Sequence, residues 1–236
     1  MNDPSRTGTA TARFVATHSV LTLDARHPYV AKSLVDAQDM HRTVMSGFQG
    51  WVDDGSRDAR AQLGVLSTWT LDLKEAVLVL VVQSRVAGDW GRVPNGALRE
   101  APRLITVDRT FRTGDTVGFR AVVNPAYSTM RVRPDGQVLR GQRVAHTRPE
   151  GVRKWCARQF GNDDAPARAG ATAAPDTISV RMLPAVSSPA PHKGLKVARA
   201  ELRGMLTVTD PAVFVGALAD GIGHARAYSC GLVLTR

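Results

Sequence analysis

The pattern of apolar and polar positions in the first half of the chain predicts strands separated by helical or turn-rich segments. Short apolar runs rich in Val, Leu and Thr, which are typical of strands, occur at 13–23, 61–71, 76–86 and 103–111. A helix is expected at 33–48, with Ser33 as its N-cap and Asp36 in the place of a capping-box acid. Its buried stripe, at helical spacing, comprises Ala37, Met40, Val44 and Phe48. Residues 89–100 contain Pro and Gly and allow at most a short helix.

The second half of the chain repeats this order of elements. Strand patterns occur at 116–125, 177–183, 195–208 and 226–236. A helix at 148–160 has Pro149 in its first turn, and its apolar face comprises Val152, Trp155, Cys156 and Phe160. A second helix is expected to begin after Asp210 as N-cap and to end at Gly221. Residues 161–175 have the composition of a flexible connector.

The order β-α-β-β-(α)-β thus occurs twice. It predicts an α+β fold of two tandem ferredoxin-like domains, an arrangement that RNA-recognition modules also use. The N-terminal domain is expected at 13–114, after a disordered tail at 1–12. The C-terminal domain is expected at 115–236 and carries a glycine-rich loop. No strong sequence repeat links the two halves, so this prediction rests on element order alone.

Composition places the chain among globular proteins. Hydrophobic residues make up 43% of its 236 positions, and no apolar run approaches the ~20 residues of a membrane-spanning helix. The N-terminal segment has no apolar core of the signal-peptide kind, so a cytoplasmic protein without a membrane partner is expected. Cys156 and Cys230 are expected to be buried, reduced thiols. The tryptophans are expected in the core rather than as base-stacking platforms: Trp51, Trp69, Trp90 and Trp155.

The charge changes this ordinary picture. The formal net charge is +10, and most basic side chains are arginine, which binds phosphate with two parallel donors. Residues 1–112 carry 14 basic and 12 acidic side chains, whereas residues 113–236 carry 17 and 9. An arginine-rich composition inherited from the genome explains the total, but it explains this uneven distribution less easily. The charge therefore favours a polyanionic partner such as a nucleic acid.

The stretch "GIGHARAYSC" at 221–230 lies between the last predicted helix and the last predicted strand. Dinucleotide-binding and P-loop glycines follow a strand and open a helix, so this context excludes both. Two interpretations remain. Gly221 and Gly223 form a helix C-cap and a tight turn. Alternatively, they also let the backbone approach RNA closely, while His224 and Arg226 present donors to phosphate.

Several segments, in order along the chain, resemble one family. "GIGHARAYSCGLVL" is similar to the glycine-rich loop of the CasE-type CRISPR-associated endoribonucleases, the repeat-RNA processing subunit of the type I-E Cascade complex. "DMHRTVMSGF" (39–48) resembles the histidine motif of their first helix, and "FRAVVNP" (119–125) resembles the opening strand of their second domain. The segments "VLVVQS", "DWGRVP", "GQRVAHTRPEGVRKWCARQ" and "LRGMLTVTDPAVF" follow the same pattern. The similarity runs from about residue 13 to 236.

The resemblance implies an endoribonuclease that cuts CRISPR precursor RNA at the repeat stem-loop without a metal or other cofactor. A 2′-hydroxyl would attack its own 3′-phosphate and expel the 5′-oxygen, leaving a 2′,3′-cyclic phosphate. This chemistry needs a base, an acid and positive charge at the phosphorus. His41 occupies the family's catalytic position, and histidine titrates near neutral pH. The implied partners are the repeat stem-loop, the mature guide RNA, which stays bound, and the other Cascade subunits.

The chain departs from the family's pattern at two positions. Gln38 stands where the family usually has a tyrosine, three residues before the catalytic histidine, and an amide cannot exchange a proton. The second proton transfer is then left to Tyr29, Tyr228 or water, or His41 works nearly alone in a slow enzyme. Ser229 stands where the loop often has another glycine. The first departure keeps open an alternative in which the chain is a non-catalytic guide-RNA-binding subunit of the effector complex.

Basic residues of the second half are candidates for contact with the RNA stem. A-form RNA is recognised chiefly through its shape and phosphates, which suits a spread of basic side chains. Taken singly, each of them is also explained as a solvated surface charge. RNA binding is assigned to Gly221, Gly223, His224, Arg226, Arg153, Lys154, Arg158 and Lys193. Further basic candidates are Arg131, Arg133, Arg140, Arg143, Arg148 and Lys196. No zinc, paired-carboxylate or Ser-His-Asp pattern is present, so no metal site is expected.

Overall fold

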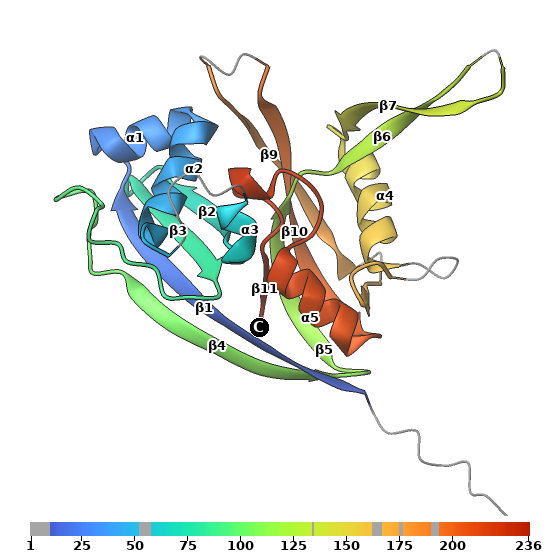
Figure 1. Cartoon of the computed structure of the whole chain (residues 1–236), viewed down its shortest axis with the longest axis horizontal. Helices are drawn as coiled ribbons and strands as arrows, with labels where there is room; N and C mark the ends of the chain where they lie inside the picture. The colour runs from blue at the N-terminus through green and yellow to red at the C-terminus, as the bar shows by residue number, and fades with distance from the viewer. Residues whose placement is uncertain (1–9, 52–57, 134, 162–166, 175–176, 190–193) are drawn as a thin grey trace, which may run out of the picture.

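The computed structural model describes residues 10–51, 58–133, 135–161, 167–174, 177–189 and 194–236. Within these ranges the chain is a mixed α+β protein with three antiparallel sheets (Figure 1). The α+β class expected from the pattern is therefore confirmed. None of the helices in this part of the chain has the length and apolar character that a bilayer crossing requires.

The first sheet collects the four strands of the first half in the order β2-β3-β1-β4. Its strands are β1 (Thr11–Asp24), β2 (Leu66–Asp72), β3 (Val77–Ser84) and β4 (Arg103–Arg112). Alternate residues of β3 enter the core, where Leu78, Leu80 and Val82 are fully buried, as the side-chain period of a strand requires. β1 begins two residues before the expected strand, so Thr11 and Ala12 belong to the sheet rather than to a tail.

The helix expected at 33–48 is interrupted at Asp36. One helix, α1 (Pro28–Val35), ends before this residue, and a second, α2 (Ala37–Met45), begins after it. The Asp36 backbone is extended, and its carboxylate accepts a hydrogen bond from the Gln38 backbone N–H at 2.8 Å, which makes it the N-cap of α2. Ser33, the cap expected from the pattern, lies inside α1. The expected stripe is confirmed, because Ala37, Met40, Val44 and Phe48 are all buried.

The second sheet has the order β11-β5-β10-β8, and β9 also pairs with β10. Its strands are β5 (Thr116–Val123), β8 (Ala171–Thr172), β9 (Ser179–Ser187), β10 (Lys196–Val208) and β11 (Val233–Thr235). Its two helices are α4 (Pro149–Phe160) and α5 (Pro211–Asp220). The expected apolar face of α4 is confirmed by the burial of Val152, Trp155, Cys156 and Phe160. The expected N-cap of α5 is also confirmed: the Asp210 carboxylate accepts from the Val213 backbone N–H at 3.1 Å.

Four segments differ from the sequence-based expectation. Residues 126–145, for which no element was expected, form a hairpin of β6 (Ala126–Val132) and β7 (Val138–Ala145) that projects from the body beside α4 (Figure 1). The short helix α3 (Ala59–Gln62) takes up the start of the strand expected from residue 61. The strand expected at 226–236 begins as a 3-10 turn, η3 (Arg226–Tyr228). The expected connector contributes Ala169 and Ala171 to the core, and its residues 162–166 lie outside the described residues.

The tryptophans divide into three environments. Trp90 and Trp155 are core residues, as expected. Trp51 is 53% exposed, so the prediction of a core position was wrong for it. The Trp69 ring, partly buried, lies 4.2 Å from the guanidinium carbon of Arg199, a cation–π contact that helps to hold this buried arginine. Cys156 and Cys230 are buried and free, as expected, and burial raises the pKa of both thiols to about 12.

The two halves of the chain share packing. Phe14 and Ala16 of β1 belong to the same core cluster as Phe214 and Leu218 of α5. The Gln83 amide of β3 donates to the backbone carbonyl of Leu218 at 2.8 Å. α5 therefore packs against the first sheet, and the segment that follows it is carried to the helices of the first half.

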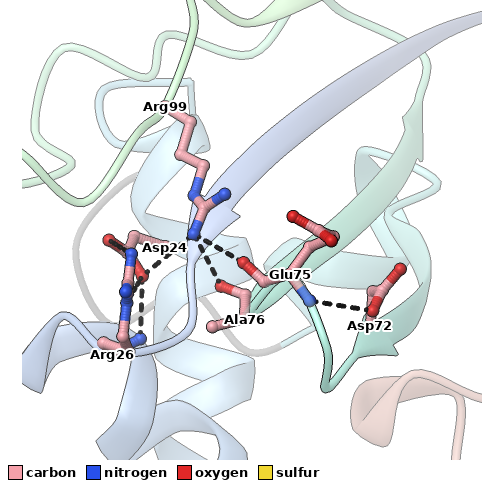
Figure 2. Close-up of polar contacts among 6 residues, drawn as sticks. All are labelled: Asp24, Arg26, Asp72, Glu75, Ala76 and Arg99. Atoms are coloured by element: carbon pink, nitrogen blue, oxygen red, sulfur yellow. Dashed lines mark hydrogen bonds and ion pairs between the residues drawn. The ribbon is translucent and has the colours of Figure 1, made fainter.

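The segment between β3 and β4 is held by polar contacts where the strands end (Figure 2). The Arg99 guanidinium donates to the backbone carbonyls of Glu75 and Ala76 at 2.8 and 3.2 Å, and lies 3.5 Å from the Asp24 carboxylate. Hydrogen bonds from Arg26 are the main cause that lowers the pKa of Asp24 to about 2. These contacts fix the irregular chain at 85–102 without a helix, in keeping with the Pro and Gly of this segment.

Candidate functional site

The glycine-rich loop returns from α5 to α2. The Ile222 backbone N–H donates to Gly231 at 2.9 Å, and the Gly231 N–H donates to Val122 of β5 at 2.7 Å, which closes the loop at its base. Within the loop, the Ser229 hydroxyl lies 3.0 Å from that of Ser67 in β2, and both residues are buried. As a result η3, the small red helix of Figure 1, lies beside α2 and β2.

The two glycines at the start of the loop, Gly221 and Gly223, lie where neighbouring atoms leave no space for a side chain. Gly221 has φ +75, and a Cβ on it would lie 2.9 Å from the Gly231 carbonyl oxygen and from Leu66. Gly223 has φ +74, and its Cβ would lie 2.8 Å from the Trp155 ring. Both positions therefore exclude a side chain through backbone conformation and through contact with the protein. This geometry supports the C-cap and turn interpretation, and contact of the Gly221 and Gly223 backbone with RNA stays a prediction.

His41 lies on α2 and meets the loop at Ala227. The pKa of this half-buried histidine is lowered, first by burial and then by the charge of Arg60. A hydrogen bond to the Ala227 backbone raises the pKa, and the charge of Arg42 lowers it slightly further. A bond that raises the pKa of an imidazole is one in which a ring N–H donates, here to a backbone carbonyl. The net effect favours neutral imidazole, whose second ring nitrogen is then a base.

Positive charge collects around His41. Arg42 follows it on α2, and Arg60 of α3 is close enough to lower its pKa. Burial is the first cause that lowers the pKa of Arg60 itself, and the charge of Arg226 is the second, so these two guanidiniums lie near each other. The half-buried Arg226 also donates from Nε to the Gly223 carbonyl at 3.2 Å. Arg42 forms an ion pair with Asp39, and Asp58 is the third influence on Arg60 and raises its pKa. Arg60 and Arg226, whose charges repel each other, are therefore the guanidiniums best suited to an anion such as a phosphate.

Arg60 was not singled out from the sequence. It lies in "GSRDARAQLG", a polar segment with no motif, and it is brought to His41 by the four-residue helix α3. Its guanidinium Nη1 donates to the Val65 carbonyl at 3.0 Å, which fixes the side chain. The only sequence signal for this residue was its positive charge.

Gln38 and Tyr228 meet at the same place. The Gln38 amide nitrogen donates to the Tyr228 phenol oxygen at 2.9 Å, across a sequence separation of 190 residues. The His41 and Tyr228 rings are arranged edge to face, with 6.5 Å between their centroids. Tyr29, the other tyrosine considered, packs against the core of the first half. The loop thus brings a phenol to the helix position at which the family usually has its tyrosine.

The remaining predicted RNA-binding residues form a second region. Arg153, Lys154 and Arg158 are exposed on α4, which lies on the far side of β9 and β10 from α2 (Figure 1). His146, at the base of the β6–β7 hairpin, stacks on Tyr127 and lies 3.4 Å from Arg158. His224 forms an isolated bridge with Asn124. Lys193 and the side chains of Arg131 and Arg140 lie outside the described residues; Arg133, Arg143, Arg148 and Lys196 are exposed.

No group of His, Cys, Asp and Glu side chains suited to a metal ion occurs in the described part of the chain. The side chains that meet near the imidazole of His41 include a phenol, an amide and guanidinium groups. Together they offer proton acceptors, proton donors and fixed positive charge.

Comparison with known proteins identifies the family. The model of a family described as "CRISPR associated protein" matches residues 18–236. This chain is a CRISPR-associated protein. The resemblance drawn from the sequence is confirmed at this level. No curated protein sequence matches the chain.

Solved structures of CRISPR-associated proteins share its fold. Cse3 of Thermus thermophilus, bound to an RNA that represents a pre-cleavage complex, is 20% identical, with a TM-score of 0.67 over 94% of this chain and 100% of that one. The CRISPR-associated protein Cas6e of Escherichia coli K-12 is 18% identical, with a TM-score of 0.63 over 93% and 98%. A chain of a CRISPR RNA-guided surveillance complex is 15% identical, with a TM-score of 0.58 over 93% and 98%.

Proposed function

We propose that this CRISPR-associated protein is a metal-independent endoribonuclease that cleaves CRISPR precursor RNA at the repeat stem-loop. His41 is the catalytic residue, and Arg226 with Arg60 binds the phosphate at the cut. The observation that carries the proposal is the site itself: a half-buried imidazole that contacts the glycine-rich loop, with its pKa lowered by burial and by the nearby charge of Arg60. Chains of the same fold have been solved with RNA and in surveillance complexes, which supports an RNA substrate.

The reaction requires one proton transfer at each end of the phosphate. The 2′-oxygen forms a bond to phosphorus as its proton passes to the free nitrogen of His41. The bond between phosphorus and the 5′-oxygen breaks, and that oxygen takes up a proton to leave as a 5′-hydroxyl. The other product ends in a 2′,3′-cyclic phosphate. Charge grows on the phosphoryl oxygens as the fifth bond forms, and fixed guanidinium groups stabilise that charge.

The second basic region supports retention of the product. Arg153, Lys154 and Arg158 lie on one exposed helix face beside the projecting β6–β7 hairpin. A row of this kind contacts backbone phosphates, whose binding weakens steeply with salt. We assign the RNA stem to this region and the scissile phosphate to His41. A product held by its stem after the cut is suited to remain in a surveillance complex as mature guide RNA.

We also infer that the two sheets are tandem ferredoxin-like domains that divide near Gly114. In the first sheet, β1 lies between β3 and β4, and β2 lies on the other side of β3. β5, β9, β10 and β11 repeat that order, with α4 and α5 as the helices. The second helix of this arrangement is replaced in the first half by the irregular segment that Arg99 holds.

A non-catalytic role as a guide-RNA-binding subunit is the second candidate function. The observation that favours it is Gln38, an amide that cannot exchange a proton, one turn before His41 on α2. In that case the arginines and the loop would bind RNA without cutting it. The two candidates agree on binding and differ only in chemistry.

The test is a single-turnover assay with a labelled repeat stem-loop, excess protein and EDTA. Wild type, His41→Ala and the matched control His27→Ala, at the N-cap of α1, are compared, with binding measured on the same RNA carrying a 2′-deoxy nucleotide at the cut. We expect wild type and His27→Ala to produce a cyclic phosphate, and His41→Ala to bind RNA without cutting it. Tight binding with no cut by any of the three proteins would establish the second candidate instead.

A further inference from the structure

The proposed reaction leaves one role unfilled. If His41 accepts the proton of the 2′-hydroxyl, another group must supply a proton to the 5′-oxygen. The arginines nearby keep their protons, and the Gln38 amide has none to give. The group sought must carry an exchangeable proton, lie beside His41 and be accessible to a bound substrate.

The phenol of Tyr228 meets these conditions. It is half-buried, so it is not sealed in the core. Its ring lies edge to face with that of His41, at 6.5 Å between centroids, and the preceding residue, Ala227, supplies the backbone partner of His41. Its oxygen lies 2.9 Å from the amide nitrogen of Gln38, one helical turn before His41. One short loop segment thus contacts both helix residues.

The direction of the Gln38 bond decides what the phenol can do. A phenol has one proton to donate and lone pairs to accept, whereas an amide nitrogen only donates. The amide therefore occupies a lone pair of Tyr228 and does not consume its proton. Gln38 thus holds Tyr228 in place and leaves its proton free for transfer.

The backbone of the loop is arranged to hold this position. Ala225 and Ser229, on either side of η3, adopt φ values of +58 and +57, which non-glycine residues rarely take. The buried hydroxyl pair of Ser67 and Ser229 anchors the far side of the turn. Strained backbone that persists is held by its surroundings and is typical of functional sites.

We propose that Tyr228 is the general acid of the cleavage and that Gln38 is its positioning residue. Tyr228 gives its proton to the 5′-oxygen as the bond between that oxygen and phosphorus breaks. The resulting phenolate then recovers a proton from the imidazolium of His41, through solvent, so that both groups return to their starting state. This assignment rests on the proposed endoribonuclease function and adds to it the second proton-handling residue.

The test uses two forms of the repeat stem-loop. In one, the leaving atom is the normal 5′-oxygen; in the other it is a bridging 5′-sulfur, which leaves without being protonated. Tyr228→Phe is compared with the matched control Tyr29→Phe, whose ring packs against the core of the first half, and with His41→Ala, under single-turnover conditions. General acid catalysis contributes typically 10²–10⁴-fold. We therefore expect Tyr228→Phe to slow cleavage of the oxygen substrate by about 100-fold or more and to cleave the sulfur substrate at the wild-type rate.

Gln38 is tested by Gln38→Glu, which has the same shape but reverses the hydrogen bond, because a carboxylate accepts the phenol proton. We expect it to slow the oxygen substrate and not the sulfur substrate. The melting temperature and the affinity for uncleavable 2′-deoxy RNA exclude misfolding as the cause. If wild type cuts and Tyr228→Phe cuts the oxygen substrate equally fast, or is slowed equally on both substrates, the tyrosine assignment is overturned while the endoribonuclease stands. If wild type cuts neither substrate, the proposed function itself is overturned.

Discussion

Replacing Arg60 by methionine gives the sharpest test of the charge arrangement around His41. Methionine keeps much of the apolar stem and removes the charge. Arg60 lies on α3, is fixed by its bond to the Val65 carbonyl, and influences the titration of His41 from outside its helix. No sequence motif pointed to it. Its role follows only from the geometry of the folded chain.

Two effects are expected from Arg60→Met, and both slow cleavage at mildly acidic pH. The pKa of His41 is lowered first by burial and then by Arg60, so removing the charge raises that pKa while the contribution of burial remains. More His41 is then protonated at mildly acidic pH, and less of it can act as a base. In addition, a charge-assisted hydrogen bond to the phosphate is lost. Such a bond contributes about 1.5–3 kcal/mol, and its loss slows cleavage roughly 10- to 150-fold, since every 1.4 kcal/mol is a factor of ten.

The assay combines a titration with kinetics. The imidazole proton signals of His41, assigned by comparison with His41→Ala, are followed by NMR between pH 4.5 and 8.5, and single-turnover rates are measured across the same range. Arg60→Lys is the matched control because it keeps the charge. We expect the pKa of His41 to rise in Arg60→Met and to stay near the wild-type value in Arg60→Lys.

The reasoning is refuted if Arg60→Met leaves both the titration of His41 and the rate of cleavage unchanged. A changed titration with an unchanged rate would show that Arg60 influences His41 but does not bind the phosphate. A slower rate with an unchanged titration would limit Arg60 to the phosphate.

Three further predictions follow from particular contacts. In the wild type, kcat/KM should rise with pH through a midpoint below 6.5 and be level at neutral pH, since burial lowers the pKa of His41. A kcat/KM that falls as the pH rises over this range would make His41 the acid. Gly223→Ala should lower the melting temperature more than Gly114→Ala. Both positions have positive φ, which costs a side chain roughly 1–2 kcal/mol, but of the two only Gly223 would also place a Cβ 2.8 Å from Trp155. Equal losses in melting temperature would contradict this. Trp69→Leu should lower the free energy of unfolding in urea by about 1–2 kcal/mol, because the cation–π contact with buried Arg199 is lost. The control Trp51→Leu, at an exposed residue, should lower it by at most about 0.5 kcal/mol. Similar losses for both would show that the contact contributes nothing.

The parts of the fold that the sequence predicted are those with a local cause. The stripe of α2 and the apolar face of α4 follow from helical spacing, and the cap of α5 follows from Asp210 before Pro211. The break at Asp36 was missed because the apolar spacing continues across it. Two helices form because Asp36, and not Ser33, is the N-cap of α2. The Ser33 hydroxyl instead contacts that of Thr43, where α1 packs against α2.

The elements that the sequence did not predict depend on contacts between residues distant in the sequence, or lack the apolar pattern by which a strand is recognised. The β6–β7 hairpin exposes Met130 and Val144, so its strands lack the apolar alternation of a strand that packs on a core. The last strand was expected from residue 226, but η3 interrupts it. That turn is stabilised by contacts with Ser67, Gln38 and His41, all of them distant in the sequence.

The candidate site is assembled from both ends of the chain, and this explains why sequence motifs showed only half of it. His41 was visible as a histidine in a recognisable helix motif. Its partners Arg60 and Tyr228 reach it because the Arg60 guanidinium bonds to the Val65 carbonyl, just before β2, and because α5 packs on β1. The hydrogen bond between Gln38 and Tyr228 joins residues 190 positions apart. Gln38 on α2 therefore does not mean that the site lacks a phenol, since the loop supplies that of Tyr228 from the other end of the chain.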